Sequence, residues 1–149
     1  MLCENALMIA VQVRRFLDRA RDFHNGKVLL RDEKLLGDDL STYRLSSALL
    51  GIHCAISFSD ALRAGMGHEK LSSYDHSKAA SDLETILKSR NFENRKGIGH
   101  LKKLLGMKSR VAYEPAMVRE NDIEDIVKQA ERFADWAEET GRKLKIEGW

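Results

Sequence analysis

The sequence predicts one all-α domain spanning residues 1–149, an up-and-down bundle of four to five helices. Several segments carry apolar residues at three- and four-residue spacing, which places those residues on one face of a helix. No segment alternates apolar and polar residues as a strand would. With 149 residues, 43% of them hydrophobic, the chain can build one core and is too apolar to be disordered.

The first helix is predicted from the N-terminus to Asn25-Gly26, which is expected to end it. Between Lys27 and Asp39 the apolar residues lack a long period, and Gly37 interrupts them. A loop with one short helical turn in VLLRDEKLL is expected there. The apolar stripe of the first helix consists of Leu2, Ala6, Ile9, Ala10, Val13, Phe16, Leu17 and Ala20.

The second helix should begin near Ser41 as its N-cap and run to about Arg63, with Gly65 and Gly67 ending it. Its stretch LSSALLGIHCAISFS has no charged residue, which is typical of a central helix. The stretch is shorter than a membrane span, so no membrane association is expected. Its uncharged surface looks larger than one small bundle needs, which predicts a homodimer.

The third helix is expected to be capped by Ser72 or Ser73 and to end near Arg90. Two glycines in NFENRKGIGH then predict a break in the chain, followed by a short fourth helix closed by Gly106 or soon after. The apolar face of the third helix is Ala79, Ala80, Leu83, Ile86 and Leu87, and that of the fourth is Leu101, Leu104 and Leu105.

The last helix is predicted from a capping box formed by Asn121 and Glu124, with Gly141 ending it. Pro115 disfavours helix at Glu114, so the fourth and last helices should be separate. The apolar stripe of the last helix is Ile123, Ile126, Val127, Ala130, Phe133, Ala134 and Ala137.

Charge is distributed unevenly, although the net charge is only +2. The segment 88–110 has eight basic residues against one acid, for a local +7, whereas the segment 119–143 has eight acids against five bases, for −3. A basic segment with a glycine-bearing loop and a helix start can bind phosphates through cations and free backbone amides. The alternative is a solvated basic face that balances the acidic helix.

The residues in KSRVAYEPAMVRENDIEDIVKQAERFADWAEE, preceded by IHCAISFSDALRAG in the second helix, resemble the small helical domains of the HEPN superfamily. The resemblance implies a bundle of four or five helices that is commonly dimeric. Many members of this family cut RNA without a metal. Their site is an Arg, usually with a polar residue directly after it, then four to six residues and a His, and two copies of this pair meet across the dimer cleft.

This pattern is altered here. Arg110 occupies the expected place of the family Arg, but Val111 follows it, no His lies downstream, and Tyr113 is the nearest polar group. Arg95 and His100 have the required spacing, although they precede the short helix. Either this displaced pair is catalytic, with His100 as the base and Arg95 holding the phosphate, or catalysis has been lost.

The residues predicted to bind the ligand are Arg110, Tyr113, Lys96, Lys102 and Lys103. For Tyr113 the alternative is a ring packed in the core. No cofactor and no metal are expected, because the histidines are scattered and Cys3 and Cys54 lack metal-ligand spacing. The two cysteines are expected to be reduced thiols, which favours a cytoplasmic location.

These patterns support the hypothesis of a protein that binds RNA or a nucleotide-type ligand through its basic segment, as a degenerate metal-independent ribonuclease. An alternative, also implied by the resemblance, is a non-catalytic interaction module, either the partner of a nucleotidyltransferase or a toxin–antitoxin component. A plain structural bundle without a ligand is the third possibility.

Overall fold

The computed structural model describes residues 2–68 and 76–149, with the backbone only at positions 40 and 41. Over these residues the chain forms helices and no strand, so the predicted all-α class is confirmed. The elements are α1 (Leu2–Leu29), α2 (Glu33–Leu36), the 3-10 helix η1 (Gly37–Tyr43), α3 (Arg44–Gly65), α4 (Ala79–Ser89), α5 (Lys96–Tyr113), the 3-10 helix η2 (Pro115–Met117) and α6 (Glu120–Lys143).

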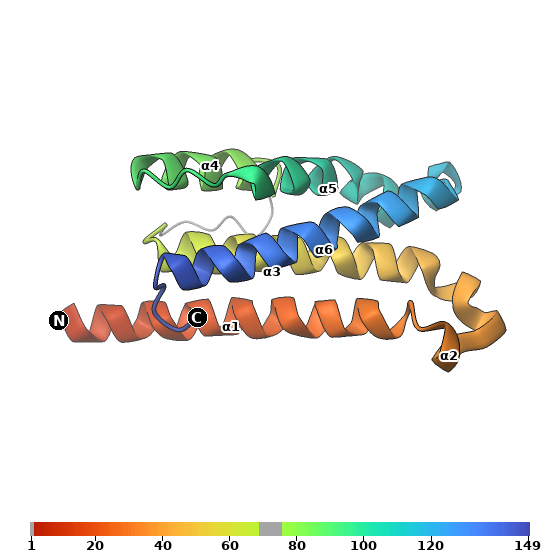
Figure 1. Ribbon diagram of the computed structural model, residues 1–149, viewed down its shortest axis with the longest axis horizontal. Coiled ribbons are helices and arrows are strands. Elements are labelled where there is room, and N and C mark those ends of the chain that lie inside the picture. The colour runs from red at the N-terminus through yellow and green to blue at the C-terminus, as the bar shows by residue number, and fades with distance from the viewer. Residues whose placement is uncertain (1, 69–75) are drawn as a thin grey trace.

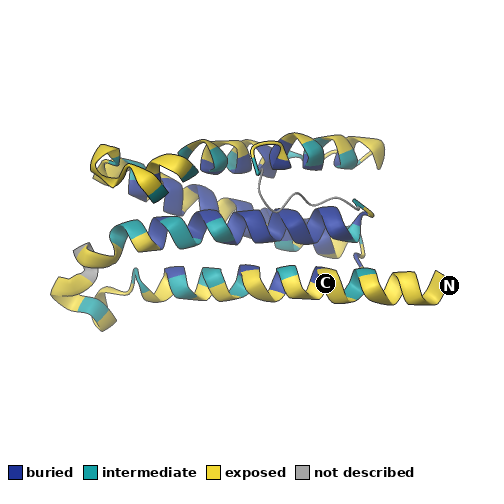
Figure 2. Cartoon of the chain, turned by 180° about the vertical axis from the view of Figure 1, so that it is seen from behind, coloured by how far each residue is buried: buried dark blue, intermediate teal, exposed yellow. Residues whose placement is uncertain are grey.

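Helix α3 is the centre of the bundle. It contacts α1, α4, α5 and α6, and Figure 1 shows α3 and α6 between α1 and the layer formed by α4 and α5. Every residue from Cys54 to Ala64 is buried, in agreement with the uncharged stretch that ends at Ser59. The two charged residues in this range, Asp60 and Arg63, form an ion pair at 2.6 Å. Figure 2 shows the same burial along α3. Side chains of the neighbouring helices, such as Leu17 of α1, Leu101 of α5 and Phe133 of α6, belong to the same core and have no exposed surface.

The burial of α3 bears on two expectations. By length and hydropathy α3 could cross a membrane, but 72% of its most apolar window is buried inside the bundle, as in the core helix of a soluble protein. The neighbouring helices of the same chain also cover its uncharged surface. Only Leu45, Ser46, Leu49, Leu50 and His53 of the uncharged stretch keep some exposure, and the homodimer stays a prediction.

The predicted end of α1 at Asn25-Gly26 is wrong, because the helix continues to Leu29. Tertiary contacts hold this last turn. A Cβ at Gly26 would lie 3.1 Å from Leu50 of α3, and the buried Lys27 places its Nζ 3.3 Å from Glu131 of α6. The short helical turn predicted in the following segment is confirmed as α2, whose first amides are bound by the Asp32 carboxylate.

The start of α3 also differs from the prediction. Ser41 lies within η1, and Tyr43 precedes the first residue of α3 without a side-chain cap. The predicted end is correct, since α3 stops at Gly65 and Gly67 adopts a positive φ of 85°. Helix α4 begins at Ala79, and the predicted caps Ser72 and Ser73 lie outside the described residues.

The break predicted in NFENRKGIGH is confirmed, because residues 90–95 separate α4 from α5, although it ends before the two glycines. The short fourth helix is wrong, because α5 extends over eighteen residues with Gly97, Gly99 and Gly106 inside it. Packing decides this, since Gly97 lies against the Trp136 ring of α6. The predicted effect of Pro115 is confirmed, because α5 ends at Tyr113.

Both ends of α6 lie outside the predicted limits. The Asp122 carboxylate accepts the Arg119 backbone N–H at 2.9 Å, so the helix is capped two residues before the Asn121–Glu124 box. It then passes through Gly141 to Lys143. The missing Cβ of Gly141 leaves room for the ring of Trp149, which covers this turn.

Candidate nucleic-acid interface

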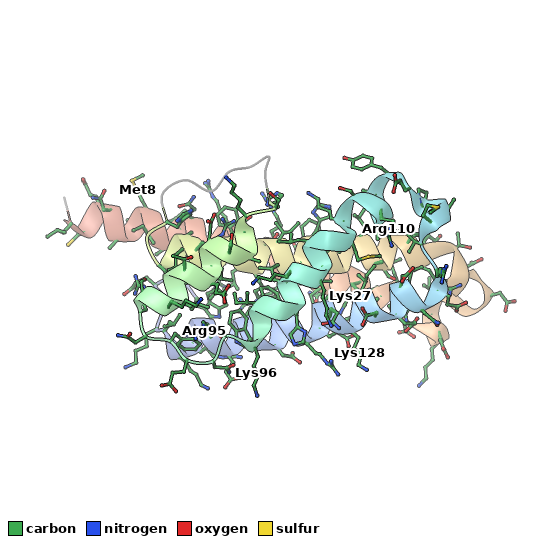
Figure 3. All side chains as sticks on the ribbon, turned by 90° about the horizontal axis from the view of Figure 1, so that it is seen from above. Met8, Lys27, Arg95, Lys96, Arg110 and Lys128 are labelled. Atoms are coloured by element: carbon green, nitrogen blue, oxygen red, sulfur yellow. The ribbon has the colours of Figure 1, made fainter. Side chains whose placement is uncertain are left out.

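One exposed line of residues follows the full length of α5, and we call it the α5 stripe. Its members are three or four residues apart, which places them on one side of the helix, opposite the buried Ile98, Leu101 and Leu104. They are Lys96, Gly99, Lys103, Gly106, Arg110 and Tyr113, all exposed. Figure 3 shows Lys96 at one end of α5 and Arg110 at the other.

The three cations of the α5 stripe recur every seven residues, so successive charges lie about 10 Å apart along the helix axis. No acidic side chain among the described residues forms an ion pair with Lys96, Lys103 or Arg110. Lys102 differs, because its Nζ lies 3.2 Å from Glu84 Oε2 of α4. This contact lowers the pKa of the Glu84 carboxyl and compensates the charge of Lys102.

The two glycines of the α5 stripe have no packing role within the described chain. A Cβ added at Gly99 or Gly106 would meet no atom within 4 Å. Glycine inside a helix costs about 0.5–1 kcal/mol relative to alanine, because its backbone loses more freedom on folding. Between the cations, these two positions leave bare backbone that a ligand can approach closely.

Tyr113 ends the α5 stripe with 82% of its surface exposed. The alternative of a ring packed in the core is therefore wrong. An exposed ring beside cations can stack on a nucleobase, and its hydroxyl can donate to a phosphate oxygen.

His100 lies half-buried beside the α5 stripe, four residues after Lys96 and three before Lys103. Its Nδ1 is 2.5 Å from Oε1 of the buried Gln129, whose Nε2 donates to Asp125 Oδ1 at 3.1 Å. Because the amide nitrogen of Gln129 faces a carboxylate, its oxygen accepts, and Nδ1 of His100 is the donor. Nε2 of His100 has no partner in the described part of the chain and can meet a ligand.

Arg95 precedes the first turn of α5, and among the described residues no hydrogen bond joins it to His100. Its Nη1 donates to the Phe92 carbonyl at 3.0 Å and so stabilises the connection from α4. His100, by contrast, is held by Gln129 of α6. The two residues predicted as a catalytic pair therefore make separate contacts in this structure.

We compared the chain with protein families, curated proteins and solved structures. None matches. The resemblance to HEPN domains therefore stays a prediction. Over residues 2–68 and 76–149, no group of three or more His, Cys, Asp or Glu side chains is placed to hold a metal ion.

Sequence reasoning missed a groove of about 830 Å³ between the end of α1 and the start of α6. The buried Lys27 lies at its edge, and its stem passes the small residue Gly51 of α3. The burial of Lys27 was not predicted from the sequence, because this residue directly follows the glycine expected to end the helix. The lining includes Lys27, Arg31, Asp32, Glu124, Asp125, Lys128 and Glu131.

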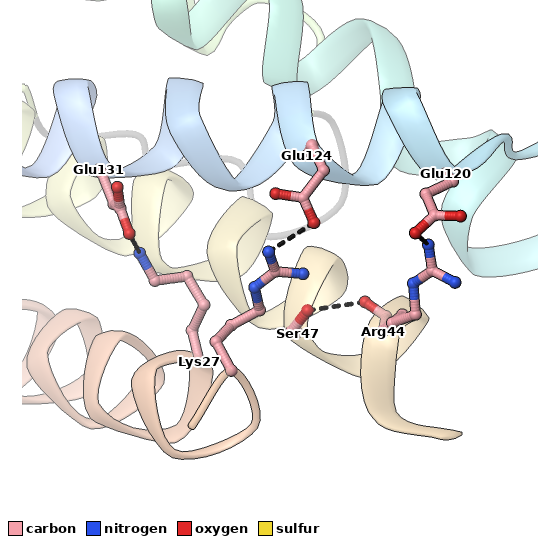
Figure 4. Close-up of polar contacts among 7 residues, drawn as sticks. Lys27, Arg44, Ser47, Glu120, Glu124 and Glu131 are labelled. Atoms are coloured by element: carbon pink, nitrogen blue, oxygen red, sulfur yellow. Dashed lines mark hydrogen bonds and ion pairs between the residues drawn. The ribbon is translucent and has the colours of Figure 1, made fainter. Parts of the chain in front are cut away.

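Ion pairs compensate most of the charge in and near this groove. Arg31 lies 2.5 Å from Glu124, Lys27 pairs with Glu131, and Arg44 at the start of α3 pairs with Glu120 (Figure 4). These pairs fasten α1 and α3 to α6. The acidic residues of α6 thus have a structural use, whereas the cations of the α5 stripe have no acidic partner within residues 2–68 and 76–149.

Proposed function

We propose that this protein binds RNA through the α5 stripe. The observation that carries the proposal is the seven-residue repeat of unpaired, exposed cations, Lys96, Lys103 and Arg110, with bare glycine backbone between them. From first to last these cations span about 21 Å of helix. This length exceeds one nucleotide and suits a phosphodiester chain, which makes a polymer the better candidate than a mononucleotide.

Binding without efficient cutting is the expected behaviour. His100 lies beside the α5 stripe with an available Nε2, but Arg95 is engaged by the Phe92 carbonyl. Arg110 is followed by no His, as the sequence shows. A single histidine can act as a base, but without a neighbouring arginine to stabilise the charged phosphate it should cleave a phosphodiester only inefficiently.

The finer assignment also belongs to this proposal. A HEPN-like, dimeric bundle is supported by the residues of the second and last helices that carry the resemblance, and by the helical order with a buried central α3. A cytoplasmic location is supported by the two cysteines, which are expected to be reduced thiols. Most of α3 is covered by helices of the same chain, so a dimer interface on another element is favoured.

The test is a salt titration of RNA affinity, read by fluorescence anisotropy with a labelled single-stranded RNA. Wild type should lose affinity as salt rises, because phosphate contacts release counterions. Lys96→Gln, Lys103→Gln and Arg110→Gln combined should weaken binding and reduce the salt slope by up to about 2, at about 0.7 for each lost contact. Circular dichroism should show an unchanged fold, since all three side chains are exposed.

Lys102→Gln is the matched control. It removes one charge from the same helix, but from a side chain already paired with Glu84, so affinity should fall less than with Lys103→Gln. A triple variant that binds like wild type would contradict the proposal. Binding of mononucleotides as tight as that of RNA would contradict the polymeric ligand.

The second candidate is an interaction module, such as the partner of a nucleotidyltransferase or a toxin–antitoxin component. The exposed apolar side chains at the start of α1 favour a protein contact, because Leu7 and Met8 are 67% and 70% exposed. If the protein does not bind RNA even at low salt, the RNA-binding proposal is contradicted and the interaction module becomes the better candidate.

A further inference from the structure

The first two turns of α1 extend past the rest of the bundle. Residues 2–8 are all exposed, and Figures 1 and 2 show this end of the helix projecting beyond the neighbouring elements. A short stretch of helix in water is only marginally stable without packing. Here it carries the large apolar side chains of Leu2, Leu7 and Met8 in solvent, and exposed apolar patches are typical of interaction surfaces.

Four exposed residues of α1 form a line that we call the α1 stripe: Glu4, Met8, Val11 and Arg15. Their spacing of four, three and four places them on one face of the helix, opposite the buried Val13. Figure 3 shows Met8 on the projecting part of α1. Among the described residues no ion pair engages Glu4 or Arg15.

We propose that a second copy of this chain docks antiparallel on the α1 stripe. The order acid, apolar, apolar, base is complementary to itself when two such helices run in opposite directions. Glu4 then faces Arg15 of the second copy, and Met8 faces Val11 of the second copy, each contact occurring twice about a two-fold axis. A parallel pair would instead oppose Glu4 to Glu4 and Arg15 to Arg15.

The surface beside the α1 stripe has room for this contact. A groove of about 760 Å³ lies there, lined by Met8, Val11 and Arg15 on α1 and by residues at the end of α3, Ala64, Gly67 and His68. Leu7, 67% exposed, flanks the same face. One helix and a neighbouring groove make a smaller interface than a standard stable complex, so the dimer should form reversibly with concentration.

The test is sedimentation equilibrium over a range of protein concentrations. Wild type should approach a dimer, and Met8→Glu should be monomeric because it buries a charge at the centre of the interface. Leu35→Glu is the matched control. Leu35 is also an exposed apolar residue, at 63%, but it lies in α2, so its variant should associate like wild type.

Charge reversal tests the antiparallel register. Glu4→Arg and Arg15→Glu alone should each weaken the dimer about tenfold, because each replaces two attractive contacts with repulsive ones. The double reversal Glu4→Arg with Arg15→Glu should restore the wild-type affinity. A monomeric wild type, a dimer unaffected by Met8→Glu, or a double reversal no better than the single ones would overturn the proposal. RNA affinity is measured in a separate experiment, so a monomeric wild type would contradict the dimer and would leave the RNA-binding proposal unaffected.

Discussion

Gly97 of α5 lies directly against the indole ring of Trp136 in α6, and a Cβ at this position would come within 2.1 Å of Trp136 Cδ2. A hydrogen bond also holds the indole, since its Nε1 donates to the Asn94 carbonyl at 2.9 Å. The absent side chain at position 97 therefore lets α5 and α6 approach each other. Two residues further on, Gly99 faces open space.

The contrast between Gly97 and Gly99 gives a stability prediction of opposite sign at two neighbouring positions. Gly97→Ala should lower the free energy of unfolding by about 1–3 kcal/mol, because the ring has to move. Gly99→Ala should raise it by about 0.5–1 kcal/mol, because alanine restricts the unfolded chain and meets no obstacle. Urea unfolding measures both. A stabilising Gly97→Ala would show that α5 does not pack on Trp136 in this way.

The glycines of the α5 stripe should lower the stability of the fold and strengthen the binding of RNA. Gly99→Ala and Gly106→Ala combined are expected to melt at higher temperature and to bind labelled RNA more weakly than wild type, since two methyl groups hold the ligand backbone away from the helix. Ser109→Ala, on the exposed side of the same helix, is the control and should leave affinity unchanged. Equal affinity of the glycine variant and wild type would mean that no ligand approaches these positions.

Lys27 and Glu131 should respond unequally to substitution. The Lys27 side chain is 1% exposed, whereas that of Glu131 is 55% exposed. Glu131→Gln leaves a buried cation without its carboxylate and should destabilise the fold by about 1–2 kcal/mol. Lys27→Met removes the buried charge and keeps an apolar stem, so it should be close to neutral. Thermal unfolding of the two variants measures the difference, and a larger loss for Lys27→Met would contradict it.

The two cysteines should react at very different rates. Cys3 is exposed, whereas Cys54 is buried and its burial raises the pKa of the thiol to about 12. A thiol-reactive disulfide reagent should therefore label one cysteine per native chain at neutral pH, because only the thiolate reacts. Cys3→Ser should abolish this labelling until the protein is unfolded. Rapid labelling of native Cys3→Ser would indicate that the core opens around Cys54.

Acid should weaken the fold through two partly buried histidines. Burial, with nearby Lys27 for His24 and Lys108 for His53, lowers the pKa of both below the ordinary 6.5. As the pH falls through 6.5, these histidines take up protons in the unfolded chain but stay neutral in the folded one. The free energy of unfolding therefore decreases from its value above pH 6.5 until the pH reaches the lower pKa of the folded state. Unfolding at pH 5 to 8 should show this decline, and His24→Gln with His53→Gln should flatten it. An unchanged slope in the double variant would assign the acid effect to other groups.

The pattern of the sequence determined the helical class and the central place of α3, because periodicity and the absence of charge report burial directly. Pro115 fixed the end of α5, since a missing N–H and a restricted preceding residue act locally. The cation spacing on α5 was also present in the sequence, but its meaning depended on reading residues 96–113 as one helix.

Tertiary structure decided what glycine does in this chain. Gly26, Gly97 and Gly141 were expected to end or interrupt helices, yet each lies inside one, facing a side chain that needs the space of the missing Cβ. Glycine inside a helix is less favourable than alanine by about 1 kcal/mol, and the close packing of two helices outweighs this cost. Which neighbour lies across from a residue is information that one-dimensional spacing does not contain. The same reason hid the burial of Lys27 and the exposure of Tyr113.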